Sequence, residues 1–203
     1  GDFTRRPYIV MERIAGSSLR TRFEAAPLPV GEVEMLGAKI AVALHDLHRQ
    51  HVVHLDVKPS NIMFRSTGEA VLIDFGLSRH DQLPDLLEEE FSLPLGTGPY
   101  MSPEQVQFVR NDPRSDLFAL GVMLYHLTTG QRPFGSPSTV SGLRKRLYTD
   151  PIPPRAHRAG LRAGRELIEH VFGNAPELSS HAIRSAIGMP VSVFTTRWSS
   201  MPT

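Results

Sequence analysis

The sequence contains no cysteine, which excludes disulfide bonds, thiolate catalysis and cysteine-ligated zinc sites. No apolar run approaches the ~18 residues that a bilayer-spanning helix needs, so we expect no membrane span. The net charge of +1 gives no general attraction to nucleic acid or to a membrane surface. Lysine is also scarce, since only Lys39, Lys58 and Lys145 occur among the 22 basic residues. Together these absences favour a cytoplasmic protein.

The composition that remains is that of an ordinary globular protein. The chain has 203 residues, of which 40% are hydrophobic and 21% are charged, enough for one domain or a large part of one. Its first residues, GDFTRRPYIVMER, contain neither an initiating methionine nor the apolar segment of a signal peptide. We therefore interpret the chain as an internal segment of a longer protein.

Hydrophobic periodicity predicts two long helices. Between residues 31 and 49 apolar side chains recur at spacings of three and four, which is typical of an amphipathic helix. Residues 116–130 are apolar nearly all round, which indicates a buried helix that ends at Gly130. The other predicted elements are short strands at 8–11, 52–53, 62–64 and 70–73, a long loop at 77–99 and a helix at 165–172.

Chemically useful side chains gather around the short strands. The stretch HLDVKPSN, residues 54–61, contains Asp56, Lys58 and Asn61, and Asp74 directly follows the 70–73 strand. Phosphoryl transfer needs oxygen ligands for Mg²⁺, a carboxylate that accepts a hydroxyl proton and a cation that offsets phosphate charge. Each residue alone is more often a turn or a solvated side chain. Their combination makes phosphoryl transfer the leading hypothesis.

The order of the motifs strengthens that hypothesis. HLDVKPSN is followed by DFG at 74–76, GTGPYMSPE at 96–104 and DLFALG at 116–121. This succession resembles the catalytic half of a protein kinase, closest to bacterial (Hanks-type) Ser/Thr kinases, over residues 8–172. The resemblance implies an α+β kinase-like fold, mainly the helical C-terminal lobe plus the hinge strand. It divides the chain into an N-lobe and hinge remnant (1–14), the C-lobe (15–172) and a divergent tail (173–203).

The resemblance also implies roles for individual residues in the reaction. Asp56 would be the catalytic base and Lys58 its electrostatic partner. Asn61 and Asp74 would hold Mg²⁺, and Thr97 would bond toward Asp56 and Lys58. These residues would move the γ-phosphoryl group of ATP to a Ser or Thr hydroxyl of a protein substrate.

The adenine end of ATP is assigned to a different segment. YIVMERIAG, residues 8–16, resembles a kinase hinge. Met11 would be the gatekeeper, the backbone of Glu12 and Ile14 would face adenine, and Met63 would form the apolar floor. The glycine-rich loop and strand lysine of the family lie upstream of a hinge, so we expect this chain alone to bind ATP weakly and to have little activity.

Two alternatives remain open. A small-molecule phosphotransferase also carries an HxDxxxxN loop, although DFG, SPE and the long loop between them favour a protein substrate. A non-catalytic pseudokinase or binding module would explain a chain without the upstream elements. The genomic sequence upstream of Gly1 would discriminate between an active kinase and a pseudokinase.

Several departures from the family pattern bear on regulation. Leu55 replaces the arginine that clasps a phosphorylated activation loop, so activation by loop phosphate is not expected. Glu88, Glu89 and Glu90 could supply constitutive charge, although a solvated acidic run is the simpler interpretation. Ser60 replaces a glutamate that reads substrate arginine, which argues against a basic preference.

The tail and the histidines raise separate questions. Ser179 replaces the family arginine that pairs with Glu104, so Arg184 would have to compensate, or the tail would fold differently. A frameshift after Phe172 would also explain the tail. His45, His48, His51 and His54 recur at every third position, but no carboxylate cluster completes a metal site, and packing roles are the favoured interpretation. His54 and Phe75 would stack and position the loops.

Overall fold

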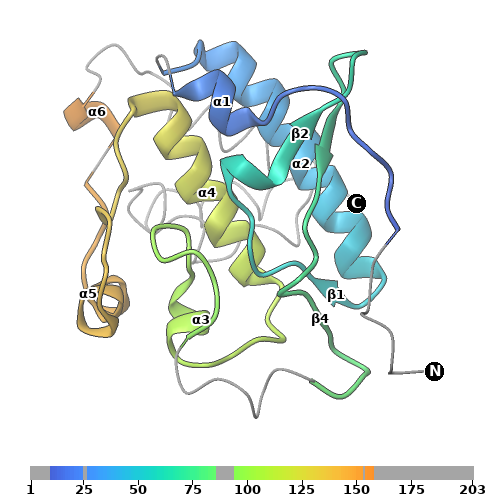
Figure 1. Cartoon of the computed structure of the whole chain (residues 1–203). Helices are drawn as coiled ribbons and strands as arrows, with labels where there is room; N and C mark the ends of the chain where they lie inside the picture. Colours follow the sequence, from blue (N-terminus) through green and yellow to red (C-terminus); the bar gives the residue numbers. More distant parts are fainter. Residues whose placement is uncertain (1–9, 25–26, 86–93, 153, 158–203) are drawn as a thin grey trace, which may run out of the picture.

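Two long helices form the centre of the molecule (Figure 1). The computed structural model describes residues 10–24, 27–85, 94–152 and 154–157. Helix α2 (Val30–Arg49) packs directly against α4 (Arg114–Thr129). Around this pair lie short helices and two small antiparallel ribbons, as expected of an α+β fold. No helix in the described ranges is long and apolar enough to cross a membrane.

Helix α4 is the most deeply buried element of the described chain. Thirteen of its 16 residues are buried, which explains why its sequence lacks a polar face. It ends at Gly130, whose φ of 73° is readily adopted by glycine, and whose N–H donates to the carbonyl of His126 at 2.8 Å. The predicted buried helix is thus confirmed. It begins at Arg114 after Pro113, two residues before the predicted start.

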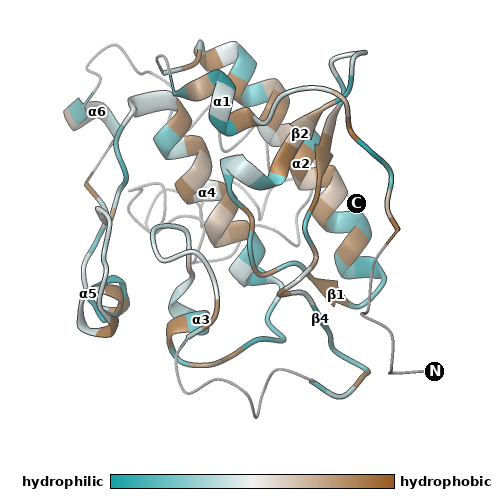
Figure 2. Ribbon diagram, in the orientation of Figure 1, coloured by the Kyte–Doolittle hydropathy of each residue, from teal (hydrophilic) through white to brown (hydrophobic). Residues whose placement is uncertain are grey.

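Helix α2 buries one face against α4. Val33, Leu36, Ile40 and Leu44 are buried and belong to the same hydrophobic cluster as the core of α4, and Leu47 packs against it partly exposed. Burying a side chain of this size stabilises the fold by roughly 1.5–3 kcal/mol. Figure 2 shows hydrophobic residues along α2, α4 and β2, with hydrophilic residues at the C-terminal end of α2. The predicted amphipathic helix is confirmed.

The two ribbons carry the loops of the site. Strands β2 (Ile62–Phe64) and β3 (Ala70–Leu72) are antiparallel with Ile62 opposite Leu72. Strand β1 (Val52–Val53) pairs antiparallel with β4 (Arg79–His80). The first three strands were predicted. The fourth lies inside the predicted 77–99 loop, and a strand of two residues is too short for its sequence to signal it.

The short helices were not predicted because three to five residues cannot display helical periodicity. Three of them are nevertheless capped by residues that favour a helix start, which are Ser18, Ser102 and Thr139. The Ser18 hydroxyl accepts from the N–H of Thr21 at 3.2 Å, and Ser102 forms a capping box with Gln105. The short helices are α1 (Leu19–Phe23), η1 (Pro59–Asn61), α3 (Pro103–Val106), α5 (Val140–Arg144), η2 (Lys145–Leu147) and α6 (Pro154–His157).

The segment that precedes α1 runs beside β2. The Phe64 N–H donates to the carbonyl of Ser17 at 3.0 Å, and Ser18 forms an isolated bridge with Met63. Of the predicted strand at 8–11, Val10 and Met11 have no regular secondary structure, so the strand is wrong there, and residues 8 and 9 lie outside the described ranges. The predicted helix at 165–172 and the tail at 173–203 also lie outside them.

Candidate active site

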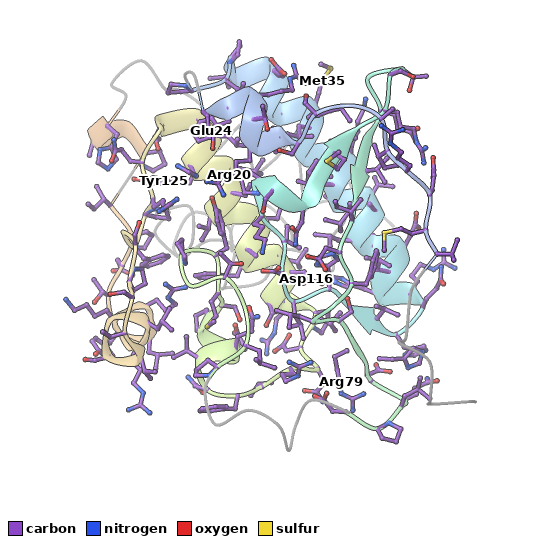
Figure 3. The ribbon with its side chains drawn as sticks, in the orientation of Figure 1. Arg20, Glu24, Met35, Arg79, Asp116 and Tyr125 are labelled. Atoms are coloured by element: carbon purple, nitrogen blue, oxygen red, sulfur yellow. The ribbon has the colours of Figure 1, made fainter. Side chains whose placement is uncertain are left out.

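The catalytic loop, residues 54–61, is fixed by a buried carboxylate on α4. Asp116 Oδ2 accepts the backbone N–H of His54 at 2.8 Å, and Oδ1 accepts that of Leu55 at 2.7 Å. The ring Nε2 of His48 lies 2.9 Å from Oδ2. Asp116 has no exposed surface, and Figure 3 shows it projecting from α4 toward this loop. Helix α4 therefore sets the position of the loop.

Leu55 adopts a backbone conformation that non-glycine residues rarely take. Its φ is 65°, which costs roughly 1–2 kcal/mol for a residue with a Cβ. Its N–H is held by Asp116, its carbonyl accepts from Gln105 Nε2 at 2.9 Å, and its side chain is buried. These contacts hold the conformation in place. Leu55 thus packs into the protein, where the family arginine would offer a charge.

His54 joins the catalytic loop to the residues before Asp74. Its ring Nδ1 accepts the backbone N–H of Asp56 at 3.3 Å, so its Nε2 carries the proton and donates to the carbonyl of Ile73 at 3.1 Å. The rings of His54 and Phe75 lie 5.0 Å apart. The two rings are in contact but tilted by 59°, so they do not stack as predicted, and Phe75 is 48% exposed.

Asp56, Lys58 and Thr97 form a closed triangle of hydrogen bonds. Lys58 Nζ donates to Asp56 Oδ2 at 2.6 Å and to Thr97 Oγ1 at 2.8 Å. The Thr97 hydroxyl donates to Asp56 Oδ1 at 2.7 Å. Asn61 Nδ2 also donates to Asp56 Oδ2 at 3.0 Å. The structure therefore brings together the three residues assigned to catalysis, although they span 42 positions of the chain.

The two residues assigned to Mg²⁺ have oxygen atoms available. Asp74 is exposed, adopts a φ of 67°, and one carboxylate oxygen accepts the N–H of Gly76 at 3.3 Å. The amide nitrogen of Asn61 donates to the backbone carbonyl of Asp56. Its Oδ1 accepts a long hydrogen bond from the hydroxyl of Ser60 at 3.4 Å. A carboxylate and an amide oxygen are a donor set that suits Mg²⁺ when phosphate and water supply the other ligands.

Of the residues assigned to adenine, Met63 lies within β2 and Glu12 pairs with Arg65, the residue after it. Met11 is 75% exposed and Ile14 is half-buried. Glu12 accepts from Arg65 Nη2 at 2.9 Å, and this hydrogen bond lowers the pKa of its carboxyl. The pair ties the predicted hinge to the residue after β2. The backbone of Glu12 and Ile14 remains the predicted adenine contact.

Asp85, an acidic residue of the predicted 77–99 loop, lies between two arginines. Arg110 Nε donates to Asp85 Oδ2 at 2.7 Å, and Arg79 Nε lies 3.5 Å from the same oxygen. The Asp85 side chain is 8% exposed. Sequence reasoning missed this group and considered Glu88, Glu89 and Glu90, which lie outside the described ranges. The sequence signal that could have identified this group is Arg79, a basic residue five positions after Asp74.

Gln105 is a second positioning residue that the sequence did not reveal. Its side-chain Nε2 donates to the carbonyls of Leu55 and Leu95, at 2.9 and 3.1 Å. Gly96 lies beside it with a φ of 136°, and a Cβ there would lie 2.9 Å from the same nitrogen. Gln105 thereby joins the catalytic loop to the segment that carries Thr97. Its position directly after the SPE motif was the available signal.

The sequence predicts that the basic stretch from Arg144 to Arg165 is solvated surface, and this prediction is wrong for Arg146, which is buried. Arg146 is 4% exposed, lies over the ring of Phe134 at 5.6 Å and donates to the carbonyl of Met101. Its burial lowers its pKa to about 10. Glu104 Oε2 is buried without a hydrogen-bond partner among the described residues, and Arg184, its predicted partner, lies outside them.

The four regularly spaced histidines have separate surroundings. His48 bonds to Asp116, His51 Nδ1 lies 3.2 Å from Asp81, and His54 bonds to the carbonyl of Ile73. His45 is half-buried on α2. Within the described ranges no group of three or more His, Asp or Glu side chains could hold a metal ion.

Comparison with known proteins gives one family. A family model described as protein kinase domain matches residues 4–158. Serine/threonine-protein kinase PknB of Mycobacterium tuberculosis (strain ATCC 25177 / H37Ra) is 34% identical over 195 residues, covering 91% of this chain and 31% of its own length. PknB of Mycobacterium leprae (strain TN) is 32% identical over 194 residues, with the same coverage of 91% and 31%.

Another relative matches this chain over fewer residues but with a higher identity. Serine/threonine-protein kinase PknL of Mycobacterium tuberculosis (strain CDC 1551 / Oshkosh) is 40% identical over 147 residues, covering 72% of this chain and 36% of its own length. The chain therefore spans about a third of the length of the curated relatives that it matches. Since the family model covers most of the chain, this chain belongs to the protein kinase family, and its similarity is to the bacterial (Hanks-type) Ser/Thr kinases.

Proposed function

We propose that the protein containing this chain is a Ser/Thr protein kinase that moves the γ-phosphoryl group of ATP to a protein hydroxyl. The triangle of Asp56, Lys58 and Thr97 is the observation that carries the proposal. It presents a carboxylate, a cation and a hydroxyl within hydrogen-bonding distance of one another. Phosphoryl transfer depends mainly on positioning and charge stabilisation, which such a group supplies.

Asp56 is suited to accept the proton of the acceptor hydroxyl. Its backbone is fixed through His54, and both carboxylate oxygens are oriented by hydrogen bonds. As the acceptor oxygen bonds to phosphorus and the bond to ADP breaks, the hydroxyl proton passes to a carboxylate oxygen. Lys58 then compensates negative charge on the transferring group, because its ammonium already lies between Asp56 and Thr97.

Asn61 and Asp74 would hold Mg²⁺ when the nucleotide is bound. The ion would supply charge neutralisation at the phosphate oxygens. Asp74 offers an exposed carboxylate with one weak intramolecular contact, and Asn61 is oriented by its bonds to Asp56. Met11, Glu12, Ile14 and Met63 would surround adenine. These roles rest on the family resemblance, together with the place of Met63 in β2 and the contact of Glu12 with Arg65.

The remaining assignments follow from the same proposal. A protein bearing Ser or Thr would be the substrate. Thr97 bonds directly to the proposed base and thereby brings the 77–99 loop to the place where the acceptor hydroxyl would bind. The absence of cysteine suits a cytoplasmic location. We keep the division into residues 1–14, 15–172 and 173–203 as a proposal for the hinge, the C-lobe and a divergent tail.

The test uses the full-length gene product that contains this chain. Autophosphorylation and transfer to a generic protein substrate would be measured with Mg²⁺ and ATP for the wild type and for Asp56→Asn. Loss of the proposed base is expected to lower the rate by about 10²–10⁴-fold. Asp46→Asn is the matched control because Asp46 is exposed on α2.

Three results would contradict the proposal in different ways. Full activity of Asp56→Asn would exclude Asp56 as the base. A folded wild type that transfers no phosphate would favour the pseudokinase or binding module. Transfer to small alcohols or amines with none to proteins would favour the small-molecule phosphotransferase.

A further inference from the structure

A cleft lies directly beside the proposed catalytic group. Its volume is about 500 Å³, within the range of ligand-binding clefts. Lys58 and Thr97 are among the residues that line it, so the cleft reaches the triangle described above. The other walls come from α1, from Tyr100 and from the end of α4 with the loop after it. We call this space the acceptor cleft, because a peptide whose hydroxyl approaches Asp56 would place its neighbouring residues there.

Most charges around the acceptor cleft are paired locally. Lys58 bonds to Asp56 at 2.6 Å. Arg20 Nε bonds to Glu24 Oε1 at 2.9 Å, and Figure 3 shows both side chains together at α1. Each cation therefore already has an acidic neighbour. Neither pair leaves a net charge to attract a substrate.

Arg132 is the exception among the described charges of the cleft. It is half-buried in the cleft wall. It donates to the hydroxyl of Ser136 and lies against the phenol of Tyr100, and both of these groups are neutral. Its Nε atom is buried without a hydrogen-bond partner in the described structure. No carboxylate among the described residues forms an ion pair with it.

The groups next to Arg132 do not neutralise it. The Tyr100 hydroxyl and His126 Nδ1 lie 3.0 Å apart and share a hydrogen bond. Burial, together with the charge of Arg132, lowers the pKa of His126 to about 4, so the imidazole is neutral near pH 7. Burial also raises the pKa of Tyr100, which keeps its phenol neutral. The guanidinium is therefore an uncompensated positive charge beside the proposed acceptor site.

We propose that Arg132 binds an anionic side chain of the acceptor peptide, a carboxylate or a phosphate, close in sequence to the phosphorylated Ser or Thr. This inference rests on the proposed kinase function and specifies its substrate class. A guanidinium presents several N–H donors in a planar fork that matches both anions. A basic peptide side chain would meet a like charge, so the acceptor cleft selects against it.

A peptide series tests this preference in the full-length gene product that contains this chain. Each peptide carries one Ser or Thr acceptor, and one neighbouring position at a time is varied among Asp, Asn, phosphoserine and Arg. We expect kcat/KM for Asp to exceed that for Asn by about tenfold at one or more positions, because hydrogen bonds to charged groups are the strong ones. A larger gain with phosphoserine would identify phosphate as the anion, and a larger gain with Asp would identify carboxylate.

Variants of Arg132 assign the preference to this residue. Arg132→Gln should bring the ratio of kcat/KM for the Asp peptide to that for the Asn peptide close to one. Arg132→Glu should shift the preference toward the Arg peptide, and Arg132→Lys should retain part of the preference for Asp. Arg49→Gln is the matched control, because Arg49 is exposed at the C-terminal end of α2, away from the cleft (Figure 1). Thermal unfolding would verify that each variant is folded.

The outcomes separate this inference from the function on which it rests. Transfer that proceeds equally with Asp, Asn and Arg at every position would overturn the inference and leave the kinase assignment intact. An acidic preference that survives in both Arg132→Gln and Arg132→Glu would also overturn it. Absence of transfer to every peptide and protein would overturn the proposed function instead.

Discussion

Replacing Asp116 by asparagine tests whether α4 fixes the catalytic loop. The carboxylate accepts three hydrogen bonds, from the N–H groups of His54 and Leu55 and from the ring of His48. Asparagine has the same shape but a single acceptor oxygen. Whichever way the amide turns, its NH₂ group faces a backbone N–H, so at least one buried donor loses its acceptor.

The size of the effect follows from burial. Asp116 has no exposed surface, and a buried unsatisfied donor costs about 1–3 kcal/mol. Removing one partner of a buried charged group costs about 3–5 kcal/mol in total. We therefore expect Asp116→Asn to lower the free energy of unfolding by about 3–5 kcal/mol, a large fraction of the roughly 5–15 kcal/mol that holds a typical domain folded.

Urea unfolding followed by circular dichroism measures this difference. Asp46→Asn removes a carboxylate from the exposed side of α2, and its effect should stay within about 0.5 kcal/mol. If the free energy of unfolding of Asp116→Asn differed from that of the wild type by less than about 1 kcal/mol, the three hydrogen bonds would not be what positions the catalytic loop. The loop would then depend on the packing of Leu55 and His54.

Two further predictions concern backbone packing and pH. Gly16→Ala should destabilise the fold by about 1–3 kcal/mol, since its Cβ would lie 1.9 Å from the carbonyl oxygen of Phe64. Gly31→Ala, with no atom within 4 Å, should be neutral or stabilising in the same urea assay, and equal effects would refute the contact. For His126, the folded pKa of about 4 lies below the ordinary 6.5, so the unfolded state binds the proton first and stability falls as pH drops from about 6.5 toward 4. His126→Asn should flatten this part of the stability curve, and an unchanged slope would argue against a buried neutral imidazole.

The elements that could be predicted from the sequence are those in which a pattern of residues extends over many positions. Helix α2 displays its apolar face over five turns and α4 is apolar throughout, so both could be located from periodicity. The catalytic loop was found because its polar residues stand at characteristic spacings. Thr97 was placed near Asp56 only through the family resemblance, since nothing local connects residues 41 positions apart.

What the sequence could not show depends on tertiary contacts. Arg146 looks like a surface residue in a basic stretch, yet Phe134 and the carbonyl of Met101 surround it. Asp85 is one acidic residue among several, and only the folded chain selects it as the partner of Arg79 and Arg110. The short helices form because caps and neighbours hold them, and their own length gives no periodic signal.

Because lysine is scarce in this chain, chemical labelling of amines can report on the hydrogen bonds of Lys58. Lys39 and Lys145 are exposed, whereas the Lys58 side chain is 21% exposed and its ammonium is shared between Asp56 and Thr97. The chain contains no cysteine and only these three lysines. Among the lysines of this chain, amine-directed mass labelling would therefore give two reference signals and one signal from the centre of the site. The degree to which Lys58 is modified reports directly on whether the triangle is closed.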